Sequence, residues 1–273
     1  MRSNTEPRIK RFTRCSDFKR MSNHSARPLG NRERNGSHFH AASLLIFPSL
    51  SPYEETHKIQ SQLCLDRIAR TCSDTLVLVE HKPVVTLGRT TKGQHWQGMN
   101  EHFKRQGIPV IECERGGSVT YHGPGQVVGY PILLLRDFCS GPKAYMWLLE
   151  EVLIRVLAEW GIEGKRVDKF VGVWVRDPKN STGNLAKIAA MGVKITRGVT
   201  MHGFALNVTV DLEPFEWIVP CGIEGCRVTS MAEVLETGPD LETVREQIVH
   251  HFADVFGIEW TERLTEVPPY LSL

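Results

Sequence analysis

The alternation of apolar and polar positions along the chain predicts many short strands and four longer helices. Helical spacing of apolar residues indicates helices over residues 51–70, 96–107, 142–161 and 238–257. Apolar runs bounded by glycine, proline or polar residues predict strands over residues 43–47, 75–81, 83–89, 109–114, 126–135, 172–177, 187–195 and 199–208. Several of these strands follow one another without a helix between them. This order favours an α+β fold with a mixed β-sheet flanked by helices.

The sequence shows capping residues at the start of two predicted helices, and it indicates that one predicted strand lies at the centre of the sheet. Ser51, Pro52 and Glu54 have the spacing of a capping box with proline in the first turn. Asp240 is a favourable N-cap for the last helix. The inward face of that helix would hold Leu241, Val244, Ile248, Phe252 and Val255. The run over residues 126–135 is apolar on both faces, which is typical of a central strand.

Residues 1–42 differ in composition from the rest of the chain. The first forty residues contain ten Lys and Arg against Glu6, Asp17 and Glu33, and apolar positions are few. Such a segment cannot bury enough apolar surface to offset the entropy cost of ordering it. We therefore predict a disordered N-terminal extension over residues 1–42 and a folded catalytic domain over residues 43–273. The extension fits a plain tail, a true start at Met21, or a targeting peptide.

Composition narrows the class of protein without naming a partner. The net charge is +2, and part of the excess lies in the first forty residues, so the remainder does not indicate nucleic-acid binding. No apolar run is long enough for a transmembrane helix and no signal-peptide core is present, so we expect no membrane association. Seven scattered cysteines favour a reducing compartment. The cytoplasm is the expected location, or an organelle if the extension is a transit peptide.

The first segment with unusual chemistry is "ERGGSVTYHGPGQVVGYPILLL", residues 114–135. Its glycines allow positive φ angles and close approach of the backbone to a ligand, and Arg115, Tyr121 and His122 stand among them. Consecutive backbone N–H groups in such a loop can hold an anion or a carbonyl oxygen. The segment matches neither a Walker A loop nor a dinucleotide-binding glycine motif. A tight corner between strands is the alternative, because it also needs glycine.

The second segment, "IVPCGIEGCRVTSM", places Cys221 between Pro220 and Gly222, ahead of a short helix expected near Thr229. An exposed thiol in such a loop can act as a nucleophile. Cys221 and Cys226 could instead bind a metal ion, but a single C-x4-C pair is a weak zinc motif. A buried, inert cysteine is the commonest alternative.

The third segment, "KIAAMGVKITRGVTMHGFALNV", begins with Lys187 on an otherwise apolar strand. A lysine at such a position is usually a solvated edge residue. If its side chain points inward, its charge favours the thiolate form of a neighbouring cysteine. His202 lies in the middle of the following strand, where a hydrogen-bonded core histidine is the simplest interpretation.

Taken together, the three segments resemble the lipoyl(octanoyl) transferase family. "RGGSVTYHGPGQVVGYPI" is similar to the family signature RGGxxTYHGPGQ, and "PCGI" followed by "VTSM" resembles its nucleophile loop. Lys187 precedes Cys221 by 34 residues, in the order that the family shows. The resemblance covers roughly residues 43–260. It implies a fold like the catalytic domains of biotin and lipoate protein ligases.

The resemblance also implies a reaction, its partners and a set of site residues. An octanoyl group would pass from octanoyl-acyl carrier protein to a lysine of a lipoyl domain, in lipoate biosynthesis, without a cofactor or a metal. The acceptors would be lipoyl domains of 2-oxoacid dehydrogenase E2 subunits and the glycine cleavage H protein. Cys221 would attack the thioester, and Lys187 would keep it as thiolate and accept the proton of the acceptor lysine.

The remaining site residues implied by the resemblance bind the substrate. Backbone N–H groups near Gly222 or in the glycine-rich segment would hold the oxyanion, and His122 and His202 would have positioning roles. The substrate-binding residues would be Arg115, Gly116, Gly117, Ser118, Val119, Thr120, Tyr121, His122, Ala190, Met191, Gly192, Gly203, Phe204 and Ala205. The apolar strand that follows the glycines would form one wall of the acyl pocket.

Three other functions stay open. An ATP-dependent lipoate or biotin ligase of the same fold also uses a lysine, but it holds an acyl-adenylate and needs no cysteine in this loop. An exchanger that moves lipoyl groups between proteins is the second. A non-catalytic protein that binds an acyl carrier or a lipoyl domain is the third. The presence of both Lys187 and Cys221 favours the transferase.

Overall fold

The computed structural model describes residues 39–96, 99–180, 183–223, 225–267 and 271, so most of the predicted extension over residues 1–42 lies outside the described residues. The strands are β1 (His40–Ile46), β2 (Asp74–Val79), β3 (Val84–Leu87), β4 (Val110–Glu112), β5 (Val119–His122), β6 (Gln126–Ile132), β7 (Lys165–Val167), β8 (Phe170–Arg176), β9 (Leu185–Thr196), β10 (Val199–Asn207) and β11 (Ile258–Leu264). The α-helices are α1 (Tyr53–Ala69), α2 (Asn100–Arg105), α3 (Pro142–Glu159), α4 (Glu213–Glu216), α5 (Met231–Leu235) and α6 (Leu241–Phe256). Three 3₁₀ turns complete the described elements, η1 (Gly93–His95), η2 (Leu135–Asp137) and η3 (Pro220–Gly222).

The strands form a mixed eight-stranded sheet and a separate three-stranded sheet. The large sheet has the order β11-β1-β2-β6-β10-β9-β8-β7. In it, β1 is parallel to β2 and β11, and the other neighbours are antiparallel. In the small sheet, β3 lies between its parallel neighbour β4 and its antiparallel neighbour β5. This arrangement confirms the predicted α+β class with a mixed sheet.

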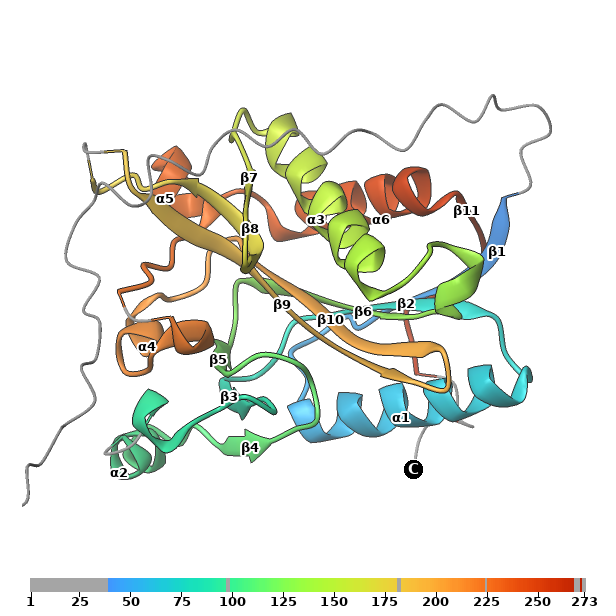
Figure 1. Ribbon diagram of the computed structural model, residues 1–273, viewed down its shortest axis with the longest axis horizontal. Helices are drawn as coiled ribbons and strands as arrows, with labels where there is room; N and C mark the ends of the chain where they lie inside the picture. Colours follow the sequence, from blue (N-terminus) through green and yellow to red (C-terminus); the bar gives the residue numbers. More distant parts are fainter. Residues whose placement is uncertain (1–38, 97–98, 181–182, 224, 268–270, 272–273) are drawn as a thin grey trace, which may run out of the picture. The chain divides into compact units, whose positions relative to one another are not determined.

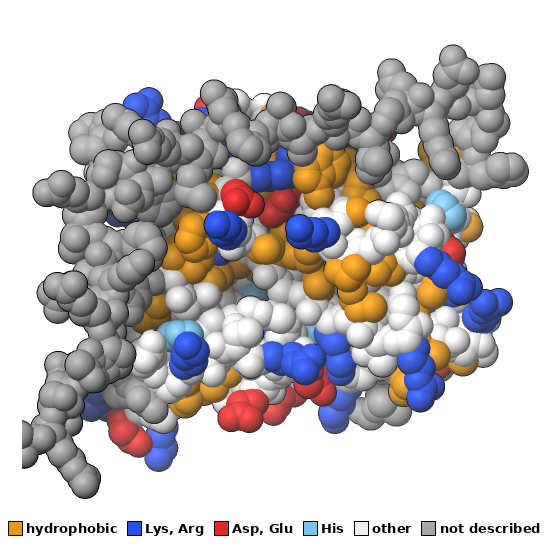
Figure 2. Space-filling view, viewed as in Figure 1, with side chains coloured by type: hydrophobic (Ala, Val, Ile, Leu, Met, Phe, Trp, Pro, Cys, Tyr) orange, Lys and Arg blue, Asp and Glu red, His pale blue; other side chains and the backbone are white. Residues whose placement is uncertain are grey.

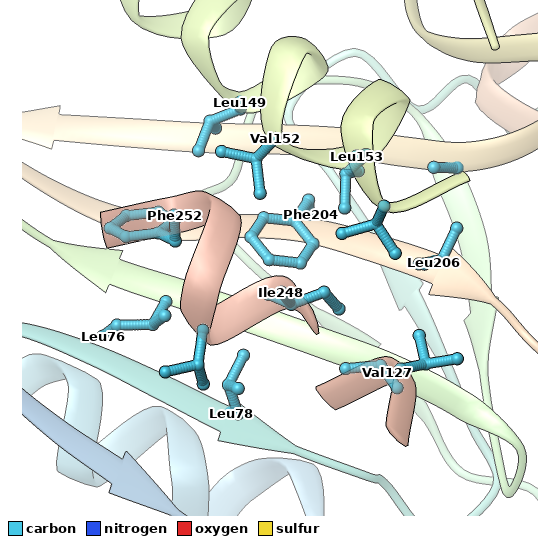
Figure 3. Close-up of a cluster of buried hydrophobic side chains, with 14 of the residues drawn as sticks. Leu76, Leu78, Val127, Leu149, Val152, Leu153, Phe204, Leu206, Ile248 and Phe252 are labelled. Atoms are coloured by element: carbon cyan, nitrogen blue, oxygen red, sulfur yellow. The ribbon is translucent and has the colours of Figure 1, made fainter. Parts of the chain in front are cut away.

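Helices cover both faces of the large sheet, with α3 and α6 on one face and α1 on the other (Figure 1). Alternate residues of β2 supply the two cores, because successive side chains of a strand point to opposite faces. Leu76 and Leu78 belong to the core under α3 and α6, whereas Val77 and Val79 belong to the core under α1. Figure 3 shows the first core, where Leu76 and Leu78 share a cluster with Phe252 of α6.

The predicted central strand is confirmed. β6 lies between β2 and β10, and all of its residues are buried. β6 and β10 approach closely because both contain glycine: a Cβ on Gly203 would lie 2.2 Å from the carbonyl oxygen of Gly129. A Cβ on Gly129 would in turn lie 2.2 Å from the ring of Phe204. Gly129 therefore serves sheet packing rather than a ligand.

The structure corrects the predicted start of the first helix. α1 begins at Tyr53 after Pro52 as N-cap, and no side chain caps it. The Ser51 hydroxyl donates instead to the carbonyl oxygen of Ser49 at 3.0 Å. The capping box predicted for Ser51 and Glu54 is therefore wrong, because proline, with its fixed φ, occupies the N-cap and shifts the first turn by one residue.

The last helix agrees with its prediction, and three strands were not predicted. Asp240 caps α6, with its carboxylate accepting a hydrogen bond from Thr243 N at 2.8 Å.

The first strand begins at His40, ahead of the domain boundary expected at residue 43. β5 is hidden in the glycine-rich segment, and β7 has only 3 residues. β11 is an edge strand whose residues are mostly exposed, so its apolar pattern is weak.

No helix in the described part of the chain combines the length and the apolar character needed to cross a lipid bilayer.

Candidate active site

Cys221 lies in a tight loop between α4 and α5. Its backbone has a φ of 58°, and hydrogen bonds from Gly222 N to Val219 O (2.9 Å) and from Ile223 N to Pro220 O (3.1 Å) close the turn. A positive φ at a residue other than glycine is strained and persists where the surrounding structure imposes it. The thiol itself is half-buried and lines a cavity. A fully buried cysteine is thereby excluded at this position.

Lys187 of β9 is the closest charged neighbour of that thiol. Its Nζ donates to Cys221 Sγ at 3.2 Å and to the carbonyl oxygen of Val171 at 3.1 Å, and it lies 4.7 Å from the centroid of the Trp174 ring. The side chain is only 3% exposed, and β9 is an interior strand. The solvated edge residue considered from the sequence is therefore wrong for Lys187. A buried ammonium beside a thiol favours the thiolate.

The backbone holds these two residues together. Lys187 N donates to the carbonyl oxygen of Arg227 at 2.8 Å, and Thr229 N donates to the carbonyl oxygen of Lys187 at 2.9 Å. The segment that follows Cys221 thus pairs with β9 as a short parallel bridge through Val228. The distance between the ammonium and the thiol is consequently set by main-chain hydrogen bonds as well as by the side chains.

Cys221 and Lys187 open onto a cavity of about 280 Å³, near the lower end of the roughly 300–1,000 Å³ typical of ligand pockets. In the space-filling view, hydrophobic side chains and patches of Lys and Arg surround a hollow near the middle of this face (Figure 2). Thirteen of the predicted substrate-binding and positioning residues line the cavity: Arg115, Gly117, Ser118, Val119, Thr120, His122, Ala190, Met191, Gly192, His202, Gly203, Phe204 and Ala205. Val128 and Tyr130 of β6 also line it, which confirms the predicted apolar wall.

Two predicted substrate-binding residues do not line the cavity. Gly116 has its amide on Val193 O at 2.9 Å, and its carbonyl accepts from Arg115 Nη1 at 3.1 Å. Tyr121 points the other way along β5 and packs edge-on against Phe215. Sequence reasoning could not separate these residues from their neighbours, because the parity of a strand is visible only once its pairing is known.

Most glycines of the glycine-rich segment serve packing. Gly117 lines the cavity, whereas the Cβ of any larger residue at Gly123 would lie 2.3 Å from the Tyr121 hydroxyl oxygen, and at Gly125 it would lie 2.6 Å from Thr209. The expectation that these glycines together approach the substrate is therefore wrong, except at Gly117. Both interpretations of the segment apply, since it forms a tight corner and one part of the cavity wall.

Arg115 fixes the shape of this loop. Arg115 is buried, with 8% of its surface exposed. Its guanidinium donates to the side-chain oxygen of Thr86 (Nε at 3.2 Å, Nη2 at 2.9 Å) and to the Thr86 carbonyl (Nη2 at 2.7 Å). With its further bond to Gly116 O, the side chain ties the loop to β3. Arginine suits this position because its planar fork can satisfy several acceptors at once.

The two predicted positioning histidines both line the cavity but differ in their hydrogen bonds. His122 Nδ1 lies 2.7 Å from Gln126 Oε1, to which it donates. Neither ring nitrogen of His202 has a hydrogen-bond partner in the described part of the chain, although the residue is only 1% exposed and has a φ of 59°. The expectation of a hydrogen-bonded core histidine is therefore wrong for His202. Both ring nitrogens are therefore buried polar atoms without a partner among the described residues, at the wall of the cavity.

Burial keeps the histidines around the cavity neutral. It lowers the pKa of His122 and of His202 to about 3 each, and that of His81 to about 4. The bonding of His81 agrees with a neutral ring, because Nδ1 donates to Ser51 O (3.1 Å) and Nε2 accepts from the Tyr130 hydroxyl (2.7 Å). Protonation of His81 would turn Nε2 into a donor, so the Tyr130 hydroxyl would then have to accept this hydrogen bond.

These lowered pKa values predict that the fold loses stability in mild acid. The unfolded histidines take up protons below their ordinary pKa of 6.5, whereas the folded ones stay neutral until about pH 3–4. The full contribution to the free energy of unfolding is therefore present above the pKa of the unfolded histidines. Below that pKa the free energy of unfolding falls as the pH falls, by up to about 1.4 kcal/mol per histidine per pH unit. We expect the free energy of unfolding from urea titrations to drop by at least about 2 kcal/mol between about pH 7 and pH 5.

A replacement of the exposed His250 by glutamine provides the control for this pH profile. It should leave the slope of stability against pH unchanged, because the exposed side chain of His250 is hydrated in the folded chain as it is in the unfolded chain. A free energy of unfolding that stays flat or rises as the pH falls from 7 to 5 would contradict neutral burial of the cavity histidines.

Two backbone amides are candidates for holding an oxyanion. Among the described residues, the N–H groups of Gly117 and Ser118 donate to no acceptor, and both residues line the cavity that Cys221 lines. The Gly222 amide, by contrast, is occupied by Val219 O. The Gly222 amide itself is therefore not an open donor, whereas the glycine-rich loop offers two amides at the other place where donors were expected.

One group of potential metal ligands lies beside the cavity. The ligand atoms of His57, Glu114 and His202 lie within 4.8 Å of one another. Glu114 is already paired with Lys194 Nζ at 3.5 Å and with His57 Nε2 at 3.6 Å. The ammonium balances the carboxylate, so we assign an ion-pair network and not a metal site to this group.

Cys226 provides a contrast to Cys221. Burial raises the pKa of the Cys226 thiol to about 11, so this thiol is protonated at neutral pH. The described cysteines, Cys64, Cys72, Cys113, Cys139, Cys221 and Cys226, are all free thiols. Of these, Cys221 is the one whose sulfur accepts a hydrogen bond from an ammonium group, and it is also the one that lines the cavity.

Comparison with protein families matches residues 52–253 to the lipoyl protein ligase A/B catalytic domain. An octanoyltransferase of Koribacter versatilis is 44% identical over 222 residues, which cover 80% of this chain and 86% of the relative. An octanoyltransferase of Nostoc punctiforme is 44% identical over 225 residues, which cover 80% of this chain and 90% of the relative.

Solved structures show the same fold at low sequence identity. A bi-partite lipoate protein ligase of Thermoplasma acidophilum aligns with a TM-score of 0.59 and 16% identity, over 85% of this chain and 91% of its own. A lipoate-protein ligase A bound with ATP aligns with a TM-score of 0.57 and 18% identity, over 85% of this chain and 92% of its own. The fold expected from the resemblance to lipoate ligases is therefore confirmed.

Proposed function

This chain belongs to the lipoyl protein ligase A/B catalytic-domain family, and from that premise we propose that it transfers an octanoyl group from a thioester donor to a lysine of a lipoyl domain. The relatives named octanoyltransferase, at 44% identity over most of both chains, support the reaction. The observation that carries the proposal is the 3.2 Å contact between Lys187 Nζ and Cys221 Sγ at the mouth of a partly apolar cavity. Lipoyl-related proteins are accordingly the substrates.

The first step would form an acyl-enzyme. The Cys221 thiolate attacks the carbonyl carbon of the octanoyl thioester, a new carbon–sulfur bond forms, and the bond to the donor sulfur breaks. The donor leaves as a thiolate that takes up a proton from the Lys187 ammonium, which leaves Lys187 neutral for the second step. Because one thioester replaces another, the free energy of the acyl group is retained and no ATP is consumed. The Lys187 ammonium would stabilise the attacking thiolate before the step.

The amides of Gly117 and Ser118 would stabilise the tetrahedral intermediate. Its oxygen carries a full negative charge that the ground-state carbonyl lacks, so donors aimed at it favour the transition state over the substrate. A single donor of this kind contributes on the order of 3–4 kcal/mol. Arg115 contributes indirectly, because it holds the loop that presents both amides.

The second step would transfer the octanoyl group to the acceptor. The neutral amine of the acceptor lysine attacks the acyl-Cys221 carbonyl, an amide bond forms, and Cys221 leaves as the thiolate. Lys187 in its neutral form would accept the proton that the amine loses, and the same residue would then again pair with the released thiolate. The apolar side chains of Val128, Met191 and Phe204 would contact the alkyl chain throughout.

The donor, the acceptors and the compartment are part of the proposal. The donor would be octanoyl-acyl carrier protein. The acceptors would be the lipoyl domains of 2-oxoacid dehydrogenase E2 subunits and the glycine cleavage H protein. The reaction would take place in the cytoplasm, or in an organelle if residues 1–42 are a transit peptide, because a nucleophilic thiol needs a reducing compartment to stay free.

The rival functions make less use of the site. A ligase that activates its acid with ATP has no task for a thiol at hydrogen-bond distance from its lysine. A non-catalytic binding protein has no need for a buried ammonium beside that thiol. A lipoyl exchanger would use the same two residues and differs in its donor, so the choice of donor separates it from the octanoyltransferase.

The test is intact mass spectrometry of the wild-type protein after mixing with octanoyl-acyl carrier protein in the absence of ATP. We expect an octanoyl-sized, hydroxylamine-labile adduct that peptide mapping places on Cys221. The adduct should disappear, and an octanoyl-lysine should form, when a lipoyl domain is added. Turnover that requires both ATP and free acid would sink the transferase and favour a ligase. An adduct from a lipoylated protein but not from the acyl carrier donor would favour the exchanger.

A further inference from the structure

His95 of η1, a residue outside the predicted site, contacts the nucleophile loop on both sides of Cys221. Its carbonyl oxygen accepts a hydrogen bond from Val219 N at 2.8 Å. Its imidazole ring lies flat against Gly222, where a Cβ would come within 2.8 Å of His95 Cε1. Gly222 also has a φ of 68°, so a larger side chain there would meet both strain and the ring.

The same imidazole contacts the glycine-rich loop on the other side of the cavity. His95 Nδ1 lies 2.6 Å from Ser118 Oγ and 3.2 Å from Lys92 N. The Lys92 amide can only donate, so Nδ1 carries no proton and the Ser118 hydroxyl is the second donor. Ser118 is 2% exposed, lines the cavity and supplies one of the two unpaired amides.

We propose that His95 is a positioning residue for acyl transfer, holding the Cys221 loop and the Ser118 amide at their reacting distance. The inference rests on the proposed function, because it assigns His95 to the geometry of the oxyanion step. His95 is not among the residues that line the cavity, so it acts through Gly222 and Ser118 and not on the substrate. A displacement of about 1 Å in a reacting geometry can cost about 10²-fold in rate.

Replacement of His95 by alanine should therefore slow acylation without changing the thiol. We expect the single-turnover rate of acyl-enzyme formation to fall about 10–100-fold, with the KM for the donor unchanged. Alkylation of Cys221 by iodoacetamide should stay within about twofold of wild type, because the contact with Lys187 is retained. His95→Asn should recover most of the acylation rate, since its amide oxygen can accept from Ser118 and Lys92.

Two partner variants make the test specific. Ser118→Ala removes the hydroxyl that His95 accepts, so the losses of His95→Ala and Ser118→Ala should be clearly less than additive. Gly222→Ala should slow acylation because the new methyl group meets the His95 ring. Combining it with His95→Ala removes that collision, so the double variant should acylate faster than Gly222→Ala alone.

The outcomes separate this inference from the function on which it rests. A wild-type protein that forms no acyl-enzyme overturns both. A wild type that is acylated, with a His95→Ala variant that is acylated at the same rate, overturns the positioning role alone. The positioning role is also overturned if His95→Ala slows alkylation and acylation equally. The same holds if the losses of His95→Ala and Ser118→Ala are strictly additive in the double variant. If the alanine variant fails to fold, Ser118→Ala keeps the experiment decisive, because it removes the same hydrogen bond, and acylation at the wild-type rate would then overturn the positioning role.

Discussion

Replacing Cys221 with alanine is expected to lower the rate of octanoyl transfer by at least about 10⁴-fold. The methyl group cannot form the acyl-enzyme, and the acceptor lysine would have to attack the donor thioester directly. The cavity and the Ser118 side of the site should stay intact, since within the described part of the chain the Cys221 side chain makes no hydrogen bond besides its contact with Lys187. Transfer of octanoyl to a lipoyl domain, followed by mass spectrometry, measures the loss.

Cys226→Ala is the matched control for this variant. It lies in the same loop region, but burial raises the pKa of its thiol to about 11, so it should have no part in the chemistry. We expect its transfer rate to stay within about twofold of wild type. A Cys221→Ala enzyme that retains more than a few per cent of the wild-type rate would refute the covalent mechanism, and a large loss in Cys226→Ala would reassign the nucleophile.

Replacing Lys187 with methionine is expected to lower octanoyl transfer by about 10²–10⁴-fold. Methionine fills much of the same space but supplies neither the charge that favours the Cys221 thiolate nor a group that accepts the proton of the acceptor amine. Both steps should therefore slow. At neutral pH the alkylation of Cys221 by iodoacetamide should also fall by about tenfold or more, because the ammonium beside the sulfur is lost.

Lys194→Met is the control on the same strand. Lys194 pairs with Glu114 at 3.5 Å and does not line the cavity, so neither transfer nor alkylation should change by more than about twofold. If Lys187→Met were alkylated as fast as wild type at neutral pH, the ammonium would not be the source of the thiolate. If transfer were unaffected as well, Lys187 would be a structural residue.

Much of the fold could be predicted from the sequence, because local patterns are enough to identify its main elements. The apolar periodicity of residues 142–161 and 238–257 led to α3 and α6, and Asp240 marked the start of the second of these helices. The double-sided apolar run from residue 126 led to the central strand β6. Of the three strands that were missed, β7 and β11 lie at the two edges of the large sheet, where short length and exposed side chains leave little apolar pattern, and β5 lies within the glycine-rich segment.

The chemistry of the site could be predicted only in part. The sequence contains a cysteine between proline and glycine, a lysine at the start of an apolar strand and a loop rich in glycine, which is enough to name candidate groups. It did not settle whether Lys187 faces solvent or the thiol, because the answer depends on β9 being an interior strand. The prediction that Gly116 and Tyr121 line the cavity is wrong, because the direction of these residues is visible only once the strand pairing is known.

The sequence by itself determined the class of fold and the segments that carry chemistry, since these follow from local composition and order along the chain, whereas the pairing of Cys221 with Lys187 was implied by the resemblance to the octanoyltransferase family. Only the tertiary structure decided the 3.2 Å contact between the two residues, the unpaired amides of the glycine-rich loop and the position of His95 between the two loops. The physical reason is that each of these features depends on strand register and on loops that are distant in sequence and meet through long-range hydrogen bonds.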